Sequence, residues 1–174
     1  LFVGSLDYPP NRDAVEELVA DHLPVLRAAC PDLQVRLVGN DSRGELNRLA
    51  RDHGVEVVGR ADDVTPHYRE STAVYLPLRG GGGTRIKVLE AFALGRPVLS
   101  TRVGVEGLPV EPGVHYLPVE RPEDGVAALA AVLRGEAADL VQRARSLVEG
   151  EFAHSVATDR MARLVERHFG ARQG

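Results

Sequence analysis

Short apolar stretches alternate with longer amphipathic stretches along nearly the whole chain. The short ones predict six strands, at residues 1–4, 34–38, 55–58, 73–76, 97–100 and 114–117. The longer ones predict helices at residues 11–29, 43–52, 64–70, 84–94, 122–134, 136–148 and 155–169. This alternation predicts an α/β fold, a doubly wound and mostly parallel Rossmann-like sheet of about six strands with helices on both faces.

The strand ends of such a sheet predict where a ligand binds. Right-handed crossovers bring the carboxyl ends of parallel strands to one edge, and ligands bind there. The loops after Gly4, Gly59, Leu78 and Ser100 should therefore open at the same edge. We expect residues 1–174 to form a single domain. The chain opens on an apolar stretch at its first residue, which is typical of a domain cut from a longer protein.

Composition and charge exclude several classes of function. The 174 residues are 44% hydrophobic, which suits a globular core, and the net charge is −4. Nucleic-acid binding is not expected, because there is no basic field, tryptophan is absent and other aromatic residues are few. Cys30 is the single cysteine, so a disulfide framework is excluded and a reducing, cytoplasmic location is expected. The sequence contains neither a stretch of about 18 apolar residues nor a signal-peptide pattern.

The most informative segment is RGGGGTRIKVLE, which runs from Arg79 to Glu90 and contains the only lysine of the chain, Lys87. Glycines let backbone N–H groups converge, and the start of a helix adds partial positive charge, so the segment predicts an anion site. We expect Thr84 to cap the helix. Arg85 and Lys87 would then oppose the helix dipole at a cost of about 0.3–1 kcal/mol each, which a bound diphosphate would offset.

The helix after the glycines carries a second signal. Ile86, Leu89 and Phe92 share an apolar arc with Ala93, whereas Lys87 and Glu90 project from another side. Lys87 and Glu90 are i, i+3 neighbours, so one interpretation is a simple surface ion pair. The other is that Glu90 accepts hydrogen bonds from ribose hydroxyls one turn beyond a phosphate site. We favour the second interpretation because a surface pair does not require a glycine run.

Several catalytic classes lack their motifs. The first strand-to-helix turn, residues 4–11, does not contain G-x-G-x-x-G, and the glycine run is not followed by the Gly-Lys-Ser/Thr of a phosphate-binding P-loop. A nicotinamide dehydrogenase and a P-loop ATPase are therefore not expected. The six histidines are scattered without the spacing of metal ligands, so we predict no metal site. Glu106 lies in a Gly-Val-Glu-Gly-Leu stretch at the predicted ligand edge and is a further site candidate.

Residues 2–11, 81–101 and 104–108 together resemble the retaining glycosyltransferases of family four. The resemblance is to the C-terminal, donor-binding half of their two-Rossmann B-type fold, and it spans essentially the whole chain. It implies transfer of a sugar from a nucleoside diphosphate donor, with that donor as substrate and no separate cofactor or metal. It also implies that the acceptor is bound mainly by an N-terminal domain outside this chain, and it allows peripheral membrane association only for the full-length protein.

The resemblance also implies a role for each site residue. Arg85 and Lys87 would hold the diphosphate as catalytic residues, and Glu90 would bind ribose as the second glutamate of the family's Glu-x7-Glu motif. Gly59 and Arg60 would lie beside the nucleotide base. The remaining donor-binding candidates are Gly4, Ser5, Gly81, Gly82, Gly83, Thr84 and Glu106.

Two positions depart from the family pattern. The first glutamate of Glu-x7-Glu would fall at position 82, where this chain has Gly82. The family's Gly-Arg…Lys-Gly phosphate pair after the first strand is replaced by Gly4-Ser5 and Tyr8-Pro9. We expect Arg85 and Lys87 to supply the charge that this pair would provide.

Three alternatives to a glycosyltransferase remain open at this point. A sugar-nucleotide epimerase of the same architecture would also use the anion site. A non-catalytic nucleotide-sugar sensor would fit the loss of a glutamate at Gly82. A purely structural domain would use the glycines only to turn the chain. The sequence leaves the base, the sugar, the linkage and the acceptor undetermined.

Overall fold

The predicted parallel sheet is present, as two three-stranded parallel sheets that meet edge to edge. In the computed structural model, which describes residues 1–153, 156 and 158, the first sheet has the order β1-β2-β3 and the second β4-β5-β6. The Tyr75 amide donates to the Leu1 carbonyl at 2.9 Å, so the β1 and β4 segments are neighbours. The strands are β1 (Phe2–Val3), β2 (Arg36–Val38), β3 (Glu56–Gly59), β4 (Val74–Leu76), β5 (Val98–Ser100) and β6 (Leu117–Pro118).

The helices follow the predicted order, with differences at their ends. They are α1 (Pro9–Glu17), η1 (Leu18–His22), α2 (Leu23–Ala29), α3 (Glu45–Asp52), α4 (Thr65–Glu70), α5 (Ile86–Ala93), η2 (Val103–Val105), α6 (Pro122–Leu133) and α7 (Ala138–Glu151). The single helix predicted at 11–29 is a run of three, because a π-helical turn, η1, lies between α1 and α2. The predicted helix 155–169 lies outside the described residues except at positions 156 and 158.

Two of the boundary differences have simple causes. α1 begins at Pro9, two residues before the prediction, because proline is well accommodated in a first helical turn, where the N–H has no partner within the helix. β6 begins at Leu117 rather than at position 114, since the preceding residues form a turn in which the Gly113 amide donates to the Tyr116 carbonyl.

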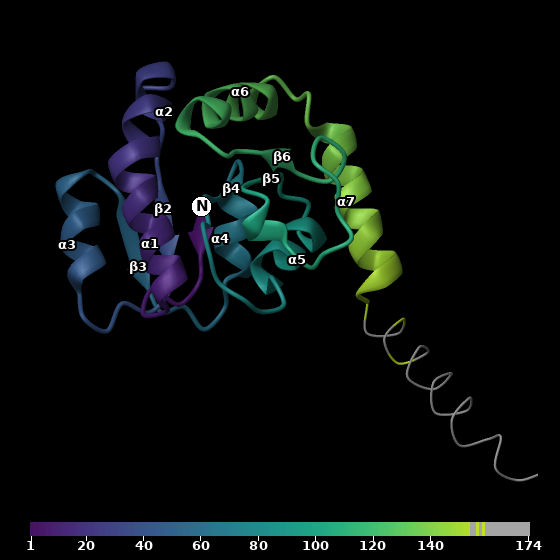
Figure 1. Ribbon diagram of the computed structural model, residues 1–174, viewed down its shortest axis with the longest axis horizontal. Helices are drawn as coiled ribbons and strands as arrows, with labels where there is room; N and C mark the ends of the chain where they lie inside the picture. Colours follow the sequence, from purple (N-terminus) through teal and green to yellow (C-terminus); the bar gives the residue numbers. More distant parts are fainter. Residues whose placement is uncertain (154–155, 157, 159–174) are drawn as a thin grey trace, which may run out of the picture.

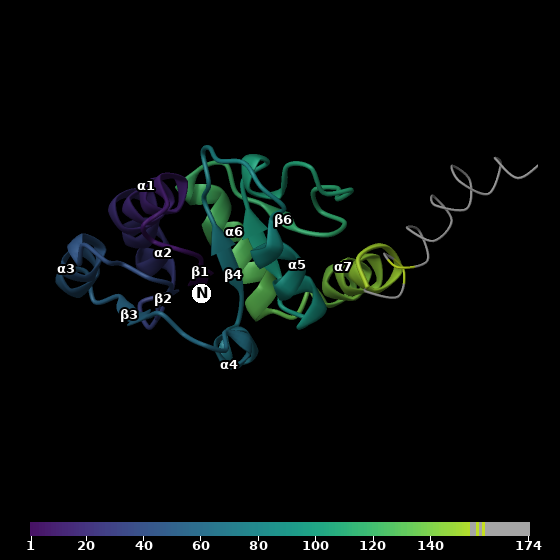
Figure 2. The same ribbon diagram turned by 90° about the horizontal axis from the view of Figure 1, so that it is seen from below.

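One main core joins the two sheets to the helices. Figures 1 and 2 show α1 and α3 on one side of the molecule and α5 and α7 on the other. Each large apolar side chain buried in this core contributes about 1.5–3 kcal/mol to stability. Its fully buried members include Phe2, Val15, Leu37, Leu76, Val88 and Phe92. A smaller cluster of Leu99, Val119 and Ala128 lies between β5 and α6.

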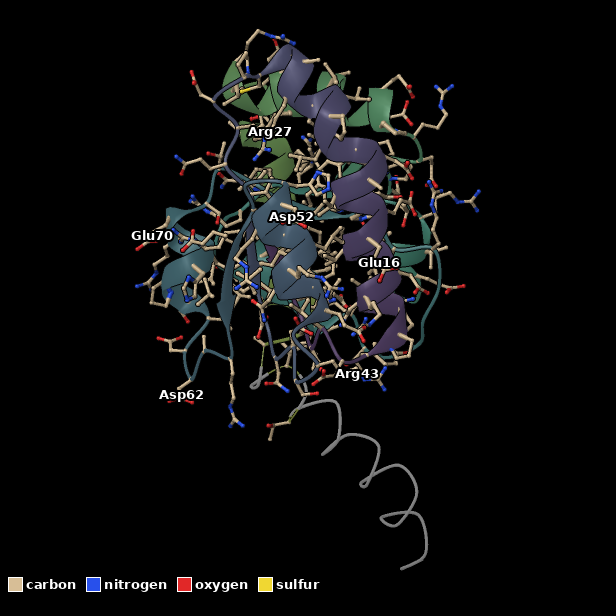
Figure 3. The ribbon with its side chains drawn as sticks, turned by 90° about the vertical axis from the view of Figure 1, so that its left-hand side faces the viewer. Glu16, Arg27, Arg43, Asp52, Asp62 and Glu70 are labelled. Carbon is tan, nitrogen blue, oxygen red and sulfur yellow. The ribbon has the colours of Figure 1, made fainter. Side chains whose placement is uncertain are left out.

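The loops that follow the strands gather at one end of the molecule. Figure 3 shows Arg43 and Asp62, from the loops after β2 and β3, at the same end, whereas Arg27 at the end of α2 lies toward the opposite end. Backbone hydrogen bonds continue the pairing beyond the strands, from the Gly4 amide to the Val38 carbonyl at 2.9 Å and from the Gly39 amide to the Gly59 carbonyl at 2.8 Å. The expected common edge of the carboxyl ends is therefore present.

Candidate functional site

A cavity of about 330 Å³ opens where the loops after β1 and β4 meet the start of α5. It brings together most of the predicted site residues, from segments that lie about 80 positions apart in the sequence. Its lining consists of Val3, Gly4, Ser5, Tyr8, Pro10, Asn11, Leu78, Gly80, Gly82, Gly83, Thr84, Arg85, Ile86, Lys87 and Glu90.

A second cavity of about 370 Å³ lies near the amino ends of β2 and β4. Apolar side chains make up most of its lining. Its arginine, Arg36, is already paired with Glu56 at 2.7 Å and with Glu70 at 2.8 Å. The cavity at α5 is therefore the better anion site, although it is slightly smaller.

The start of α5 differs from the prediction. Thr84 does not cap the helix; it is exposed, and the residue before the first helical position is Arg85. Arg85 has φ +51° and ψ +36°, and among the described residues it is the only non-glycine with a positive φ. The prediction failed because the glycine loop enters the helix through a left-handed residue, which leaves no place for a side-chain cap at Thr84. A left-handed arginine is strained, and such strain concentrates at functional sites.

The Arg85 side chain is buried, with only 8% of it exposed, and it is incompletely paired. One terminal nitrogen, Nη2, donates to the Gly81 carbonyl at 2.7 Å and lies 3.6 Å from the Glu106 carboxylate. Its Nε is buried and finds no hydrogen-bond partner among the residues that the structure describes. A buried donor without an acceptor is costly and rare, so Nε marks a place where an external acceptor would fit. Glu106 itself is 74% exposed at the end of η2, at the edge where it was predicted.

Lys87, in the first turn of α5, is held by contacts that the sequence did not reveal. Its ammonium donates to Asn11 Oδ1 at 2.6 Å and lies 4.8 Å from the centre of the Phe2 ring, within cation–π range. Burial and the neighbouring charge of Arg85 lower the pKa of Lys87 to about 8, although Glu90 opposes that shift. A bound anion would raise this pKa again, because it favours the charged form.

Asn11 is a site residue that the sequence analysis missed. Its side chain amide donates to the Ser5 carbonyl at 2.8 Å while its oxygen accepts from Lys87, so it joins the loop after β1 to α5. Asn11 is only 6% exposed. The available signal was a polar residue at the start of an amphipathic helix, directly after a strand whose carboxyl end was expected at the site.

Glu90 is oriented by Tyr68 of α4, another residue that the sequence analysis did not single out. The buried Tyr68 hydroxyl donates to Glu90 Oε2 at 2.9 Å and approaches the Lys87 carbonyl at 3.1 Å. Burial, together with the charge and hydrogen bond of Glu90, raises the pKa of Tyr68, so the hydroxyl remains a donor at neutral pH. The simple Lys87–Glu90 ion pair is not formed, because the ammonium turns to Asn11.

Two predictions about α5 need correction. Ile86 and Ala93 were expected on the apolar arc of the helix, yet both are exposed, and Ile86 is 61% exposed at the cavity. The buried positions are Val88, Ala91 and Phe92. The helix begins at Ile86, so its first side chain lies at the cavity rather than over the sheet. The predicted helix 84–94 is correspondingly shorter at both ends.

At two of the glycines, neighbouring atoms leave little room for a side chain. Gly81 has φ +103°, and an added Cβ would lie 2.9 Å from Pro10 Cβ. A Cβ at Gly4 would lie 2.7 Å from the Lys87 ammonium and 2.8 Å from Asn11 Nδ2. Gly82 differs, because it is exposed and a Cβ there would meet nothing within 4 Å. The packing therefore does not explain why position 82 lacks the family's glutamate.

Gly59 and Arg60 lie at the end of β3, outside the residues that line the cavity. They remain predictions for the base-binding side. Among the described residues, no group of three or more His, Cys, Asp or Glu side chains is arranged to hold a metal ion. None of the helices described here combines the length and apolarity that a membrane crossing requires.

Comparison with known proteins places this geometry in context. A family model described as glycosyl transferases group 1 matches residues 1–139. A phosphatidyl-myo-inositol mannosyltransferase of Mycolicibacterium smegmatis is 31% identical over 183 aligned residues, which cover 98% of this chain and 45% of that protein. This chain thus spans about half the length of the curated relative it matches.

Solved structures share the fold at low sequence identity. The C-terminal domain of a glycosyl transferase group 1 family protein, LpcC, from Francisella tularensis superposes with a TM-score of 0.65 at 16% identity, over 87% of this chain and 83% of that one. A mutant of TarM from S. aureus, in complex with fondaparinux, alpha-GlcNAc-glycerol and UDP, gives a TM-score of 0.72 at 13% identity. That match covers 92% of this chain and 34% of TarM.

Proposed function

Because this chain belongs to the glycosyl transferases group 1 family, we propose that it binds the nucleoside diphosphate sugar donor of a retaining glycosyltransferase. The observation that carries the proposal is the pair of buried cations at the start of α5. The Arg85 Nε has no partner in the described part of the chain, and the pKa of Lys87 is lowered to about 8. A diphosphate in the α5 cavity would accept a hydrogen bond from the Arg85 Nε, and its negative charge would raise the pKa of Lys87 again.

The chemistry of transfer explains why the cations would matter. When the bond between the sugar and the diphosphate breaks, negative charge develops on the departing phosphate oxygen. Donors and cations that are already in position stabilise such charge without further reorganisation. Arg85, Lys87 and the first N–H groups of α5 supply this stabilisation from one side of the cavity. These groups would act without a metal ion, so metal independence is part of the proposal.

The rest of the donor would extend in two directions from the phosphates. Glu90, held by Tyr68, would accept the ribose hydroxyls, and the backbone at Gly59 and Arg60 would lie beside the base. The glycine loop at 80–83 would run along the sugar. Glu106, now 3.6 Å from Arg85, would lie at the phosphate end of this arrangement.

The length of the chain relative to its relatives bears on where the acceptor would bind. The chain spans 45% of its mannosyltransferase relative, and it superposes on 83% of a domain solved as a C-terminal domain. We therefore propose that residues 1–174 supply the C-terminal half of a two-domain, cytoplasmic enzyme without a separate cofactor. The N-terminal half would bind most of the acceptor, and any peripheral membrane association would be a property of the full-length protein.

A calorimetric panel of UDP, GDP, ADP and their sugars tests the proposal. At least one nucleoside diphosphate should bind, and inorganic pyrophosphate should compete for the same site. Binding of none of them would refute the assignment of the α5 cavity. In the full-length protein, donor-dependent glycosylation of an acceptor would separate a transferase from an epimerase, which releases an epimer without an acceptor, and from a sensor, which does neither.

A further inference from the structure

Arg79 is the last residue before the four glycines, and its half-exposed guanidinium bonds through Nε and Nη2 to groups outside the cavity. Its Nε lies 2.9 and 3.1 Å from the two carboxylate oxygens of Glu17, and its Nη2 lies 2.6 Å from Glu17 Oε1. The same Nη2 donates to the Glu120 carbonyl at 2.8 Å. Arg79 does not line the α5 cavity, although its charge and its place in the sequence suggest a phosphate ligand.

Glu17, at the end of α1, connects Arg79 to a buried side chain. His22 is completely buried, with Nε2 3.2 Å from Glu17 Oε1 and Nδ1 2.6 Å from the Tyr75 hydroxyl. Because a carboxylate only accepts, His22 Nε2 carries a proton and donates to Glu17. Partial burial raises the pKa of Glu17, but the hydrogen bonds from Arg79 and His22 lower it by more, so the carboxyl remains ionised.

The second partner of Arg79 leads to the other loops of the same edge. The Glu120 carboxylate accepts from the Arg102 amide at 2.7 Å, in the segment just before η2. The Thr101 hydroxyl donates to the Leu78 carbonyl and accepts from the Gly104 amide. Arg79 therefore stands where α1, the start of α6 and the segment before η2 meet the glycine loop.

A loop of four glycines needs such an anchor more than other loops do. Glycine has the widest backbone freedom of any residue, so an unanchored run of four would populate many conformations. At its far end the loop is held by Arg85, which donates to the Gly81 carbonyl. Arg79 is the matching attachment at the near end, and it is made from charge-assisted bonds to a partly buried carboxylate.

We propose that Arg79 and Glu17 form a positioning pair for the donor site. Their ion pair holds the near end of the glycine loop in the conformation that shapes the cavity, and neither side chain contacts the donor. The ordering of the loop follows from the contacts alone, whereas its effect on donor binding rests on the proposed function.

The test compares Arg79→Met, Glu17→Gln and the double variant in the intact protein. We expect each single variant to weaken nucleoside diphosphate binding by about tenfold, equal to about 1.4 kcal/mol, and the double variant to be no worse than the singles. Order parameters of the backbone amides of residues 80–84, measured by ¹⁵N relaxation, should fall in all three variants, with or without nucleotide. Arg36→Met is the matched control, because it removes an arginine that also bridges two acceptors but lies at the amino end of β2.

The outcomes separate this proposal from the assignment of the site. Loss of binding in Arg79→Met but not in Glu17→Gln would make Arg79 a direct ligand and would overturn the positioning role. Unchanged order parameters in the loop would overturn it as well, and that measurement requires no ligand. Failure of the wild-type protein to bind any nucleoside diphosphate would instead count against the proposed function.

Discussion

Arg85 and Lys87 are two cations at the positive end of one helix, and the described residues compensate neither charge adequately. Within the described part of the chain, the Lys87 ammonium contacts one amide oxygen and one aromatic ring, and the Arg85 Nε has no acceptor. Such an arrangement costs stability in the unliganded protein, and a bound anion would restore that stability. Under the proposed function, this arrangement would suit a ligand with at least two negative charges.

Removing the lysine charge tests this directly. Lys87→Met keeps most of the side chain volume and should weaken nucleoside diphosphate binding by about 1.5–3 kcal/mol, the scale of a charge-assisted hydrogen bond. The melting temperature without ligand should be unchanged or higher, because a cation that opposes the helix dipole is removed. Calorimetric titration and thermal unfolding of the same samples provide both measurements. An unaltered affinity would remove Lys87 from the site.

The lowered pKa of Lys87 predicts a pH dependence of binding. Below pH 8 the side chain is mostly protonated, so nucleoside diphosphate affinity should be high at pH 7 and fall as the pH rises through about 8. Titration in buffers of different ionisation enthalpy should show proton uptake on binding near pH 8. Lys87→Arg, which stays charged, should lose this dependence.

The lowered pKa of Lys87 affects the stability of the unliganded fold in the opposite direction: affinity falls as the pH rises, whereas the free energy of unfolding increases. The unfolded lysine, with a pKa near 10.5, holds its proton more tightly than the folded one. Unfolding therefore takes up a proton between about pH 8 and 10.5, and the contribution of Lys87 to stability rises with pH in that window.

The ribose role of Glu90 is separable from the phosphate role of its neighbours. Glu90→Gln keeps an oxygen that accepts from Tyr68 but removes the charge. Affinity for UDP or GDP should fall, while affinity for inorganic pyrophosphate should change little, because the cations are untouched. Equal losses for both ligands would indicate that Glu90 acts through Lys87 instead.

At the scale of elements, the glycine loop has positions that tolerate a side chain and positions that do not. Gly81→Ala places a Cβ 2.9 Å from Pro10 at a φ of +103°, so it should lower both stability, by about 1–3 kcal/mol, and diphosphate affinity. Gly80→Ala is the control, because a Cβ there meets nothing within 4 Å and no positive φ is required. It should be neutral or slightly stabilising in chemical denaturation. Equal effects of the two substitutions would contradict the role assigned to Gly81.

The helices and strands could be predicted from the sequence better than the conformations and contacts that connect them. Apolar stretches predicted the six strands and a parallel sheet, and the glycine run with Arg85 and Lys87 predicted the position of the cavity. The left-handed conformation of Arg85 could not be predicted, because it depends on how the glycine loop enters α5. The contacts of Lys87 with Asn11 and of Glu90 with Tyr68 join residues 76 and 22 positions apart, and periodicity along one helix carries no information about such pairs.

At the scale of the whole molecule, the strand order explains why the site forms where it does. Since β1 and β4 are neighbours, the loops that follow them lie side by side, and Asn11 reaches Lys87 across that junction. The junction is also where the strand order reverses, the usual position for a ligand in an open α/β sheet. The residues that line the α5 cavity form one of its walls. Under our proposal this wall would contact the nucleotide and the phosphates.

Transfer needs a donor and an acceptor in one geometry, and that positioning accounts for about 7–11 kcal/mol of barrier lowering in favourable cases. The residues that line the α5 cavity supply cations and a ribose acceptor, but the wall facing them would come from the acceptor-binding half under our proposal. We therefore expect the 174-residue chain alone to bind a nucleoside diphosphate, more weakly than the full-length protein does, and to transfer no sugar. A radiolabelled-donor assay with and without the rest of the protein measures this. Acceptor-dependent turnover by the chain alone would show that it is a complete enzyme and would refute the two-half proposal. Nucleotide binding without turnover is the expected outcome, because these residues would form only the donor-binding wall of the site.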